Sequence, residues 1–305
     1  MKKILCLVAT CCLLLSARPL WAGTETDEKA TVATTQSTGE AVPLDLFKIE
    51  SGYVFESDLN HGGSFGKQSE IQNEFEYGHR IQLHGNFYAH LGISYDRYDF
   101  GSTGAPVPNH LQALAGVFGV DYMHGKDVGA FFQVRPGFYF QNDVGISSFD
   151  IPITLGRIFV VKEDKLYIFG GAYASFLRSG FPVLPLAGVI WIVSDDVRLM
   201  AVLPEPKLIY SPNKKLDLWV GGELVGGSFR TDRNENILPK KLNGTQIDFS
   251  EYRAGVGLTY AVCKDLSLDL GAGVSIERQF DFGRAGETYR TDPSPYVRLQ
   301  MSASF

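Results

Sequence analysis

The sequence predicts an all-β protein, a closed antiparallel transmembrane β-barrel of about 12 strands, with about 14 as the alternative. Three observations predict this fold class. Apolar and polar residues alternate with a period of two along most of the chain, and short connectors alternate with long ones. In addition, the last residues form an alternating strand that stops on Phe305.

The first residues have the order of a cleavable secretory signal. A cationic start, Met1-Lys2-Lys3, precedes an apolar run at 4–17, and the small residue Ala22 ends the segment. The run is too short to span a bilayer as a helix, which takes about 20 residues. We therefore expect a signal peptide at 1–22, a polar periplasmic segment at 23–42 and a barrel domain at 43–305.

The exported chain is acidic and nearly free of cysteine. Cleavage removes Lys2, Lys3 and Arg18, so the formal net charge falls from −6 to −9. Nucleic acid is therefore excluded as a partner, because it calls for a basic patch. Cys263 is the one cysteine beyond residue 22, so we expect no disulfide within the mature chain.

Two hairpins carry the clearest alternation. Residues 266–277 place leucine, alanine, valine and isoleucine on one face and polar residues or glycine on the other, and 252–262 behaves alike. The turn at 263–265 is too short for anything but an antiparallel hairpin. A second hairpin is predicted at 71–83 and 87–96 around the turn 84–86.

Further strand candidates cover most of the remaining chain. Transmembrane strands need about 9 to 11 residues, whereas strands of soluble proteins average about 5 or 6, so the long alternating segments favour the barrel over a soluble sandwich. The count depends on 195–214, which is either an excursion outside the barrel or a short extra hairpin. The candidates are 45–57, 110–123, 127–141, 149–160, 165–177, 186–193, 197–203, 206–210, 215–229 and 293–305.

The polar face of each strand is predicted to line the lumen, because charge on the lipid face is costly. Two interpretations stay open: an acidic wall that selects cations in a passive pore, or opposite charges that pair and seal the lumen. Eight residues are the main candidates for lining the lumen and setting selectivity: Glu74, Glu76, Arg80, Arg135, Glu251, Arg253, Asp269 and Arg298. The other predicted inward residues are Lys48, Glu50, Glu56, Asp96, Asp217, Glu223 and Glu277.

Aromatic residues and glycines have structural interpretations. Glycines inside strands, such as Gly257 and Gly271, are expected to permit bending and close approach. Aromatic side chains are predicted to form girdles at the two membrane interfaces. These aromatics are Tyr53, Tyr77, Trp191, Trp219, Tyr252 and Tyr260.

No motif indicates an enzyme. His61 and Ser64 share a predicted outer loop, but their spacing does not match the His-x-Ser motif of membrane phospholipases. His84 and His90 lie six apart in a hairpin, a spacing that does not converge on one metal ion. We therefore expect no catalytic residues, no cofactor and no metal; an outer-leaflet hydrolase at His61 and Ser64 is the least favoured function.

The C-terminal strand alternates Val297, Leu299, Met301 and Ala303 with polar residues up to Phe305. In a closed barrel the last strand pairs with the first, so an ordered terminal strand is required. This ending resembles the C-terminal signature of bacterial outer-membrane barrels. The resemblance implies a location in the outer-membrane lipid and recognition of Phe305 by the barrel-assembly machinery.

A narrower resemblance is carried by residues 184–191 (LPLAGVIW), 203–210 (LPEPKLIY) and 221–224 (GGEL). These segments are similar to a family of uncharacterised outer-membrane β-barrels, known only as a domain of unknown function. The resemblance supplies no functional residues. Two functions follow as hypotheses: a passive pore or solute-handling channel for ions or small solutes, and a structural barrel with a sealed lumen whose loops, 230–247 among them, meet an external partner.

Overall fold

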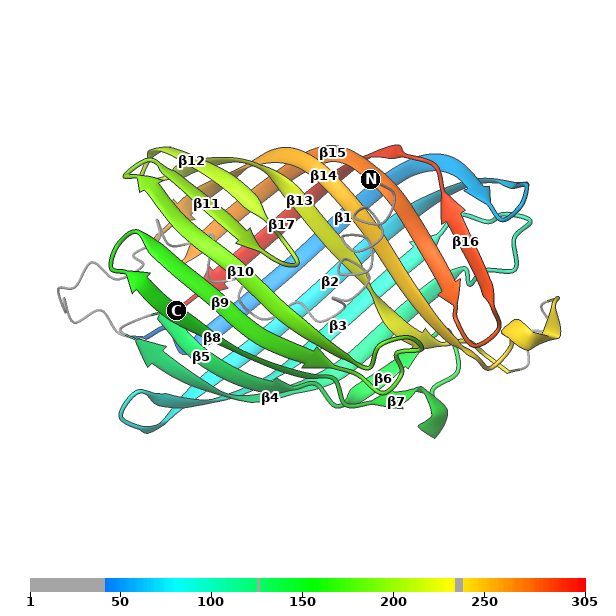
Figure 1. The fold of residues 1–305 in the computed structure, drawn as a ribbon, viewed down its shortest axis with the longest axis horizontal. Helices are drawn as coiled ribbons and strands as arrows, with labels where there is room; N and C mark the ends of the chain where they lie inside the picture. Colours follow the sequence, from blue (N-terminus) through cyan, green and yellow to red (C-terminus); the bar gives the residue numbers. More distant parts are fainter. Residues whose placement is uncertain (1–41, 125–126, 234–237) are drawn as a thin grey trace.

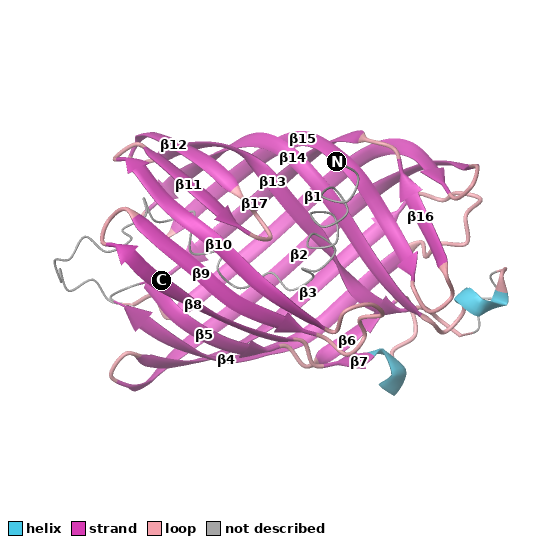
Figure 2. Ribbon diagram, viewed as in Figure 1, coloured by secondary structure: helices cyan, strands magenta, loops and turns pink. Residues whose placement is uncertain are grey.

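The computed structural model describes residues 42–124, 127–233 and 238–305, which form one closed sheet of antiparallel strands (Figures 1 and 2). The predicted signal peptide and polar segment, apart from Val42, lie outside the described residues. Within these ranges no helix is long and apolar enough to cross a membrane.

The chain forms its strands in order around the barrel, with two short 3-10 turns in the connectors. The first half contains β1 (Asp45–Asn60), β2 (Ser64–His84), β3 (Phe87–Phe100), β4 (His110–His124), β5 (Asp127–Val134), β6 (Gly137–Phe140), η1 (Ile146–Ser148), β7 (Phe149–Asp150) and β8 (Ile153–Lys162). The second half contains β9 (Leu166–Ala174), β10 (Val183–Ser194), β11 (Val197–Val202), β12 (Lys207–Asn213), β13 (Leu216–Arg230), η2 (Lys240–Leu242), β14 (Gln246–Cys263), β15 (Leu266–Phe282), β16 (Glu287–Thr291) and β17 (Ser294–Ser304).

These segments make a closed barrel of 14 strands, because three of the strands are each interrupted once. β5 and β6 both pair with β4, and β8 and β7 continue the ladder on their other side. β16 and β17 both lie between β15 and β1.

The barrel has the larger of the two predicted strand numbers because residues 195–214 form a hairpin of the wall. β11 and β12 are only 6 and 7 residues long. They nevertheless belong to the wall, because β11 pairs with β10 and β12 pairs with β13. A short hairpin is therefore inserted between two longer strands.

The first and last strands close the barrel. β1 pairs with β17 from Leu46 opposite Ser304 to Val54 opposite Tyr296. Beyond the ladder, the Phe305 amide donates to the Asp45 carbonyl at 3.0 Å. The predicted terminal strand is thus part of the seam of the barrel.

The apolar faces of the strands point outward. On β15, Leu270 and Ile276 are 48% and 50% exposed, whereas Ser267 and Asp269 are 1% and 2% exposed. A soluble sandwich would bury the apolar row instead. This inverted pattern is the one required by a barrel whose outer surface meets lipid.

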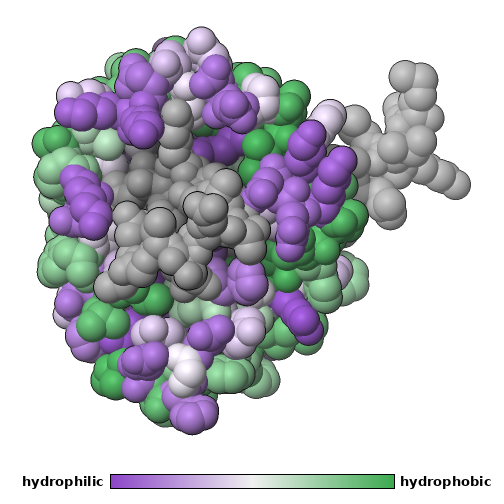
Figure 3. Space-filling view, turned by 90° about the vertical axis from the view of Figure 1, so that its left-hand side faces the viewer, coloured by the Kyte–Doolittle hydropathy of each residue, from purple (hydrophilic) through white to green (hydrophobic). Residues whose placement is uncertain are grey.

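Connector lengths divide the barrel into two ends. The connectors 85–86, 195–196, 214–215 and 264–265 lie at one end, here called the inner end, and 101–109, 141–148 and 175–182 lie at the other, the outer end. The outer end carries η1 and η2 and lies to the right in Figure 1. In the view onto the inner end, hydrophilic side chains gather at the rim and hydrophobic ones on the flanks (Figure 3).

Two β-bulges overturn predicted inward positions. A register shift between Val54 and Ser57 leaves Glu56 exposed, so its predicted inward position is wrong. A second shift, in the pairing of β14 with β15, leaves Glu277 partly exposed and 3.9 Å from Arg290. A bulge inserts one unpaired residue, and the alternation of faces changes phase across it.

Candidate functional site: the barrel interior

All eight predicted lumen residues point into the barrel, and each is at most 8% exposed. They come from both sides of the seam. Glu74, Glu76 and Arg80 lie on β2, Arg135 follows β5, Glu251 and Arg253 lie on β14, Asp269 lies on β15 and Arg298 lies on β17.

One connected group of charges surrounds Arg253 and Arg298. Arg253 lies 2.5 Å from Glu251 and 3.8 Å from Glu223 of β13. Arg298 contacts the same Glu223 at 3.7 Å, and Asp269 at 2.9 Å. Glu223 therefore joins the two arginines, and strands β13 to β17 share one ionic network.

The network reaches across the seam to β1 and β2. Arg298 lies 3.4 Å from Glu50 of β1, and Arg253 lies 3.6 Å from Glu70 of β2. Arg278 of β15 approaches Glu70 at 3.6 Å. Since β14 and β2 are not neighbours in the sheet, the contact of Arg253 with Glu70 crosses the interior rather than following the wall.

The remaining candidates form smaller pairs. Glu74 accepts a hydrogen bond from Lys48 at 3.1 Å, and Arg135 reaches Glu76 at 3.1 Å. Nearer the inner end, Arg80 lies 2.8 Å from Asp121. Glu251, Asp269, Glu74 and Glu76 thus each have a basic neighbour, and they do not form a continuous acidic wall.

Sequence reasoning missed Glu70 and Arg278. Glu70 shares the face of Gln72 and Glu74, but the predicted strand began at 71, whereas β2 begins at Ser64. Arg278 lies just beyond the predicted end of its strand, after the bulge at Ile276. Longer strand limits would have revealed Glu70, whereas no alternation signal reveals a bulge.

Trp219 belongs to the interior and not to an interfacial girdle, so that prediction is wrong for it. Its ring N–H donates to Asp269 at 2.9 Å, and the Lys207 ammonium lies 4.9 Å from its ring centroid. The ring packs over Gly257 and Gly271, where an added Cβ would meet it. Glycine is thus required here for the close approach that strand glycines predict.

An apolar sector occupies the inward faces of β9 to β12. Tyr167 and Phe169 of β9, Leu186 and Ile190 of β10, and Met200 of β11 are buried together in one cluster. The predicted girdle residue Tyr252 packs against the same cluster, as do Phe131 and Leu203. The interior is therefore divided into a charged and an apolar sector.

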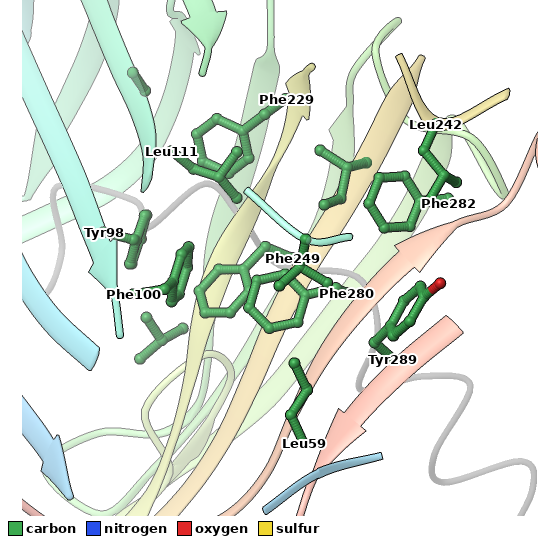
Figure 4. Packing of buried hydrophobic residues seen from close by; sticks show 14 residues of the cluster. Leu59, Tyr98, Phe100, Leu111, Phe229, Leu242, Phe249, Phe280, Phe282 and Tyr289 are labelled. Carbon is green, nitrogen blue, oxygen red and sulfur yellow. The ribbon is translucent and has the colours of Figure 1, made fainter. Parts of the chain in front are cut away.

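A second apolar cluster joins opposite walls at the outer end (Figure 4). Tyr98 of β3 lies 6.1 Å from Phe229 of β13 and 5.1 Å from Phe249 of β14, measured between ring centroids. Phe100 lies 4.9 Å from Phe280 of β15. Because β3 lies across the barrel from β13 and β14, these aromatic side chains occupy the lumen at this level.

The three segments that carry the narrower resemblance lie together at the short hairpin. Residues 184–191 belong to β10, 203–210 form the tip of the hairpin and β12, and 221–224 belong to β13. The carbonyls of Pro204 and Pro206 accept the amides of Leu224 and Gly222 at 3.0 and 2.9 Å. The shared motifs thus build one part of the wall.

Strand pairing is interrupted above this hairpin. β10 pairs with β11 only from Gly188 onward, and beyond Gly221 only the two amide-to-proline hydrogen bonds join β13 to the hairpin. The β9–β10 connector reaches β14, where the Ser179 hydroxyl donates to Asp248 at 2.6 Å. A loop, and not a strand, therefore bridges this part of the barrel.

The histidine candidates do not converge on a catalytic or metal site. His61 lies 2.8 Å from Glu287, whereas the Ser64 hydroxyl donates to Asp58 at 3.4 Å. His90 is buried 3.4 Å from Asp121, and His84 lies at the inner end. Among the described residues there is no group of three or more potential ligands suited to a metal ion.

No protein-family model matches the chain, and no curated protein matches its sequence. Several solved structures resemble it. An outer-membrane channel from Pseudomonas putida F1 is 11% identical, with 90% of this chain and 100% of that chain covered and a TM-score of 0.49. The Pseudomonas putida toluene transporter TodX is 13% identical, with 90% and 93% covered and a TM-score of 0.35. A Pseudomonas aeruginosa FadL homologue is 10% identical, with 86% and 90% covered and a TM-score of 0.39.

Proposed function

We propose that this barrel is a solute-handling protein of the bacterial outer membrane that accommodates small apolar solutes, and is not a water-filled ion pore. The apolar sector on β9 to β12 carries the proposal. A passive ion channel is lined by polar groups, whereas here inward positions of several consecutive strands, Leu186, Ile190 and Met200 among them, are apolar.

Two further observations argue against a free ion path. The aromatic cluster of Tyr98, Phe249 and Phe280 joins opposite walls at the outer end. In the charged sector the predicted selectivity residues lie in ion pairs, and a paired carboxylate attracts a passing cation less than a free one does. The selectivity role of these residues remains a prediction.

Where strand pairing is interrupted, a loop and not a hydrogen-bonded strand separates the apolar sector from the outside, which gives an apolar solute a route that avoids the aromatic cluster. Leu184 and Leu186 line the inner side of β10 where its pairing with β11 has ended. Pro185 lies in the same segment, and proline removes a backbone donor that would otherwise need a partner in lipid. We assign solute passage to this part of the wall.

The test combines conductance with dye binding. Refolded residues 23–305 are placed in a planar bilayer, and the binding of the apolar dye N-phenyl-1-naphthylamine is measured in nanodiscs against empty nanodiscs. We expect no discrete ion steps and saturable dye binding. Discrete cation-selective steps would overturn the proposal and favour a pore governed by Glu74, Glu76, Glu251 and Asp269.

A matched pair of variants locates the dye. Ile190 points inward and is buried, whereas its neighbour Val189 points outward. Ile190→Asn should weaken dye binding at least fivefold, and Val189→Asn should leave it unchanged, with a heat-dependent gel shift verifying that both variants fold. Equal effects of the two substitutions would place the dye in the lipid.

A sealed structural barrel is the second candidate, favoured by the aromatic cluster at the outer end. It predicts neither ion steps nor saturable dye binding. In either case we propose that the chain is not an enzyme, which the separation of His61 from Ser64 supports. The signal peptide, recognition of Phe305 by the barrel-assembly machinery and membership of the uncharacterised barrel family also belong to this proposal.

A further inference from the structure

One arginine lies on the outer face of the barrel among apolar side chains. Arg157 of β8 is exposed, and its neighbours on the same face of the strand are Leu155 and Phe159, which are 45% and 48% exposed. Across the ladder it lies opposite Ala130 of β5 and Gly170 of β9. Small residues therefore leave its side chain open on both sides.

Arg157 lies within the part of the wall that meets hydrocarbon. Six strand residues, at about 3.3 Å each and tilted by about 40°, place it about 15 Å from the turn that begins at Glu163. The apolar band of such barrels is about 25 Å tall, and a basic residue at its midplane costs about 2 to 4 kcal/mol. A charge retained at this depth needs a counter-charge.

The protein supplies no such counter-charge in the residues that the structure describes. Arg157 instead contacts an aromatic ring, with its guanidinium carbon 5.2 Å from the centroid of Phe159. Arg97, on the outward face of β3, differs, because two of its three guanidinium nitrogens each lie 2.7 Å from an oxygen of Asp99. An outward arginine can thus be paired within the chain, and Arg157 is not.

The direction of the side chain points to the inner leaflet. Phe159 lies two residues closer to the inner end than Arg157, so the guanidinium is turned toward the inner membrane surface, as long basic side chains do in bilayers. Lys162 and Lys165 are exposed at the following turn, on the same side of the membrane.

We propose that Arg157 binds the phosphate of an anionic phospholipid of the inner leaflet, with its acyl chains over Ala130, Gly170 and the neighbouring apolar side chains. A guanidinium pairs well with a phosphate oxygen pair, and the interaction strengthens away from water. Lys162 and Lys165 place ammonium groups where the headgroup lies, beside Glu163 and Asp164 of the same turn. The proposal requires only that the barrel spans a bilayer, and it does not depend on the solute.

The test counts bound lipids by native mass spectrometry. Protein in phosphatidylcholine nanodiscs containing phosphatidylglycerol is released, and the wild type is compared with Arg157→Leu, Arg157→Lys and the control Arg290→Leu, which removes an exposed arginine at the opposite end. We expect retained phosphatidylglycerol to fall at least fivefold in Arg157→Leu and to change less than twofold in Arg157→Lys and Arg290→Leu.

Three outcomes would overturn the proposal. The first is unchanged phosphatidylglycerol retention in Arg157→Leu. The second is displacement of the lipid by inorganic phosphate, which would indicate a site for the free anion. The third is loss of a dimer in Arg157→Leu with lipid retention unaltered, which would assign the arginine to a contact between two copies. The conductance and dye measurements distinguish each of these from failure of the proposed function.

Discussion

The charged and apolar sectors of the interior are stabilised in different ways. Around Arg253 and Arg298, buried side chains of opposite charge are held together by ion pairs, and each of the two arginines has several acidic partners. Around Ile190 and Met200, apolar side chains pack against one another in a buried cluster. The comparison teaches that this barrel has no single lining, and that Trp219, which contacts both Asp269 and the apolar cluster, lies at the boundary.

The largest effect is expected in the charged sector. Arg253→Met removes a guanidinium shared by Glu251, Glu70 and Glu223 and leaves their carboxylates buried without it. Breaking such a network costs about 3 to 5 kcal/mol. Urea unfolding of the protein in lipid vesicles measures the loss. The control is Arg290→Met at the exposed rim, and a loss equal to that control would contradict the ionic network.

A somewhat smaller loss is expected in the apolar sector. Met200→Ala leaves a cavity against Ile190 and its neighbours, which costs about 2 to 3 kcal/mol. Leu199→Ala, on the opposite face of β11, should cost less than half as much because it faces outward. Equal losses in the same unfolding assay would show that the short hairpin is not packed inward.

Trp219→Phe tests the boundary between the sectors. The substitution keeps most of the ring but removes the N–H that donates to buried Asp269, with a cost of about 1.5 kcal/mol. Trp191→Phe is the matched control, because Trp191 is exposed on the outer face. If both variants unfold at the same urea concentration, the hydrogen bond of Trp219 contributes nothing.

The smallest effect tests the bulge in β1. Glu56→Gln should change the unfolding free energy by less than about 0.5 kcal/mol, because Glu56 is exposed and not in the lumen. Glu50→Gln, six residues earlier on the inward face beside Arg298, should cost several times more. Similar losses of unfolding free energy in the two variants would indicate that Glu56 points into the lumen.

Alternation predicts the fold and the lumen residues wherever one face is polar. This condition holds on β2, β14, β15 and β17, and all eight main candidates point inward there or beside β5. The condition fails on β10, where Leu186 and Ile190 face inward while Val189 and Trp191 face outward. Because both faces of this strand are apolar, the sequence has no alternation that would show which residues line the apolar sector. Contacts across the lumen, such as Tyr98 with Phe249, depend on the curvature of the closed sheet and have no counterpart in local pattern.

Trp219 was predictable from its position. It has the same parity as Asp217 and Glu223 on β13, both of which the alternation places inside. It was assigned to a girdle because it is an aromatic residue, although its place in the inward–outward alternation of β13 puts it inside. The bulges behind Glu56 and Glu277 are different, because a single extra residue changes the phase without altering composition.

The pairing of β1 with β17 determines when the barrel can close during folding. Glu50 and Arg298, which meet there, are separated by 248 positions in the sequence. Contacts between such distant residues form late, because the entropy of closing a long loop must be overcome before the pairing contributes. Until the last strand arrives, the edge of β1 is an unprotected strand. Folding of this chain is therefore expected to be slow and sensitive to C-terminal truncation, with the final residues deciding whether the nascent sheet closes on itself or pairs with another chain.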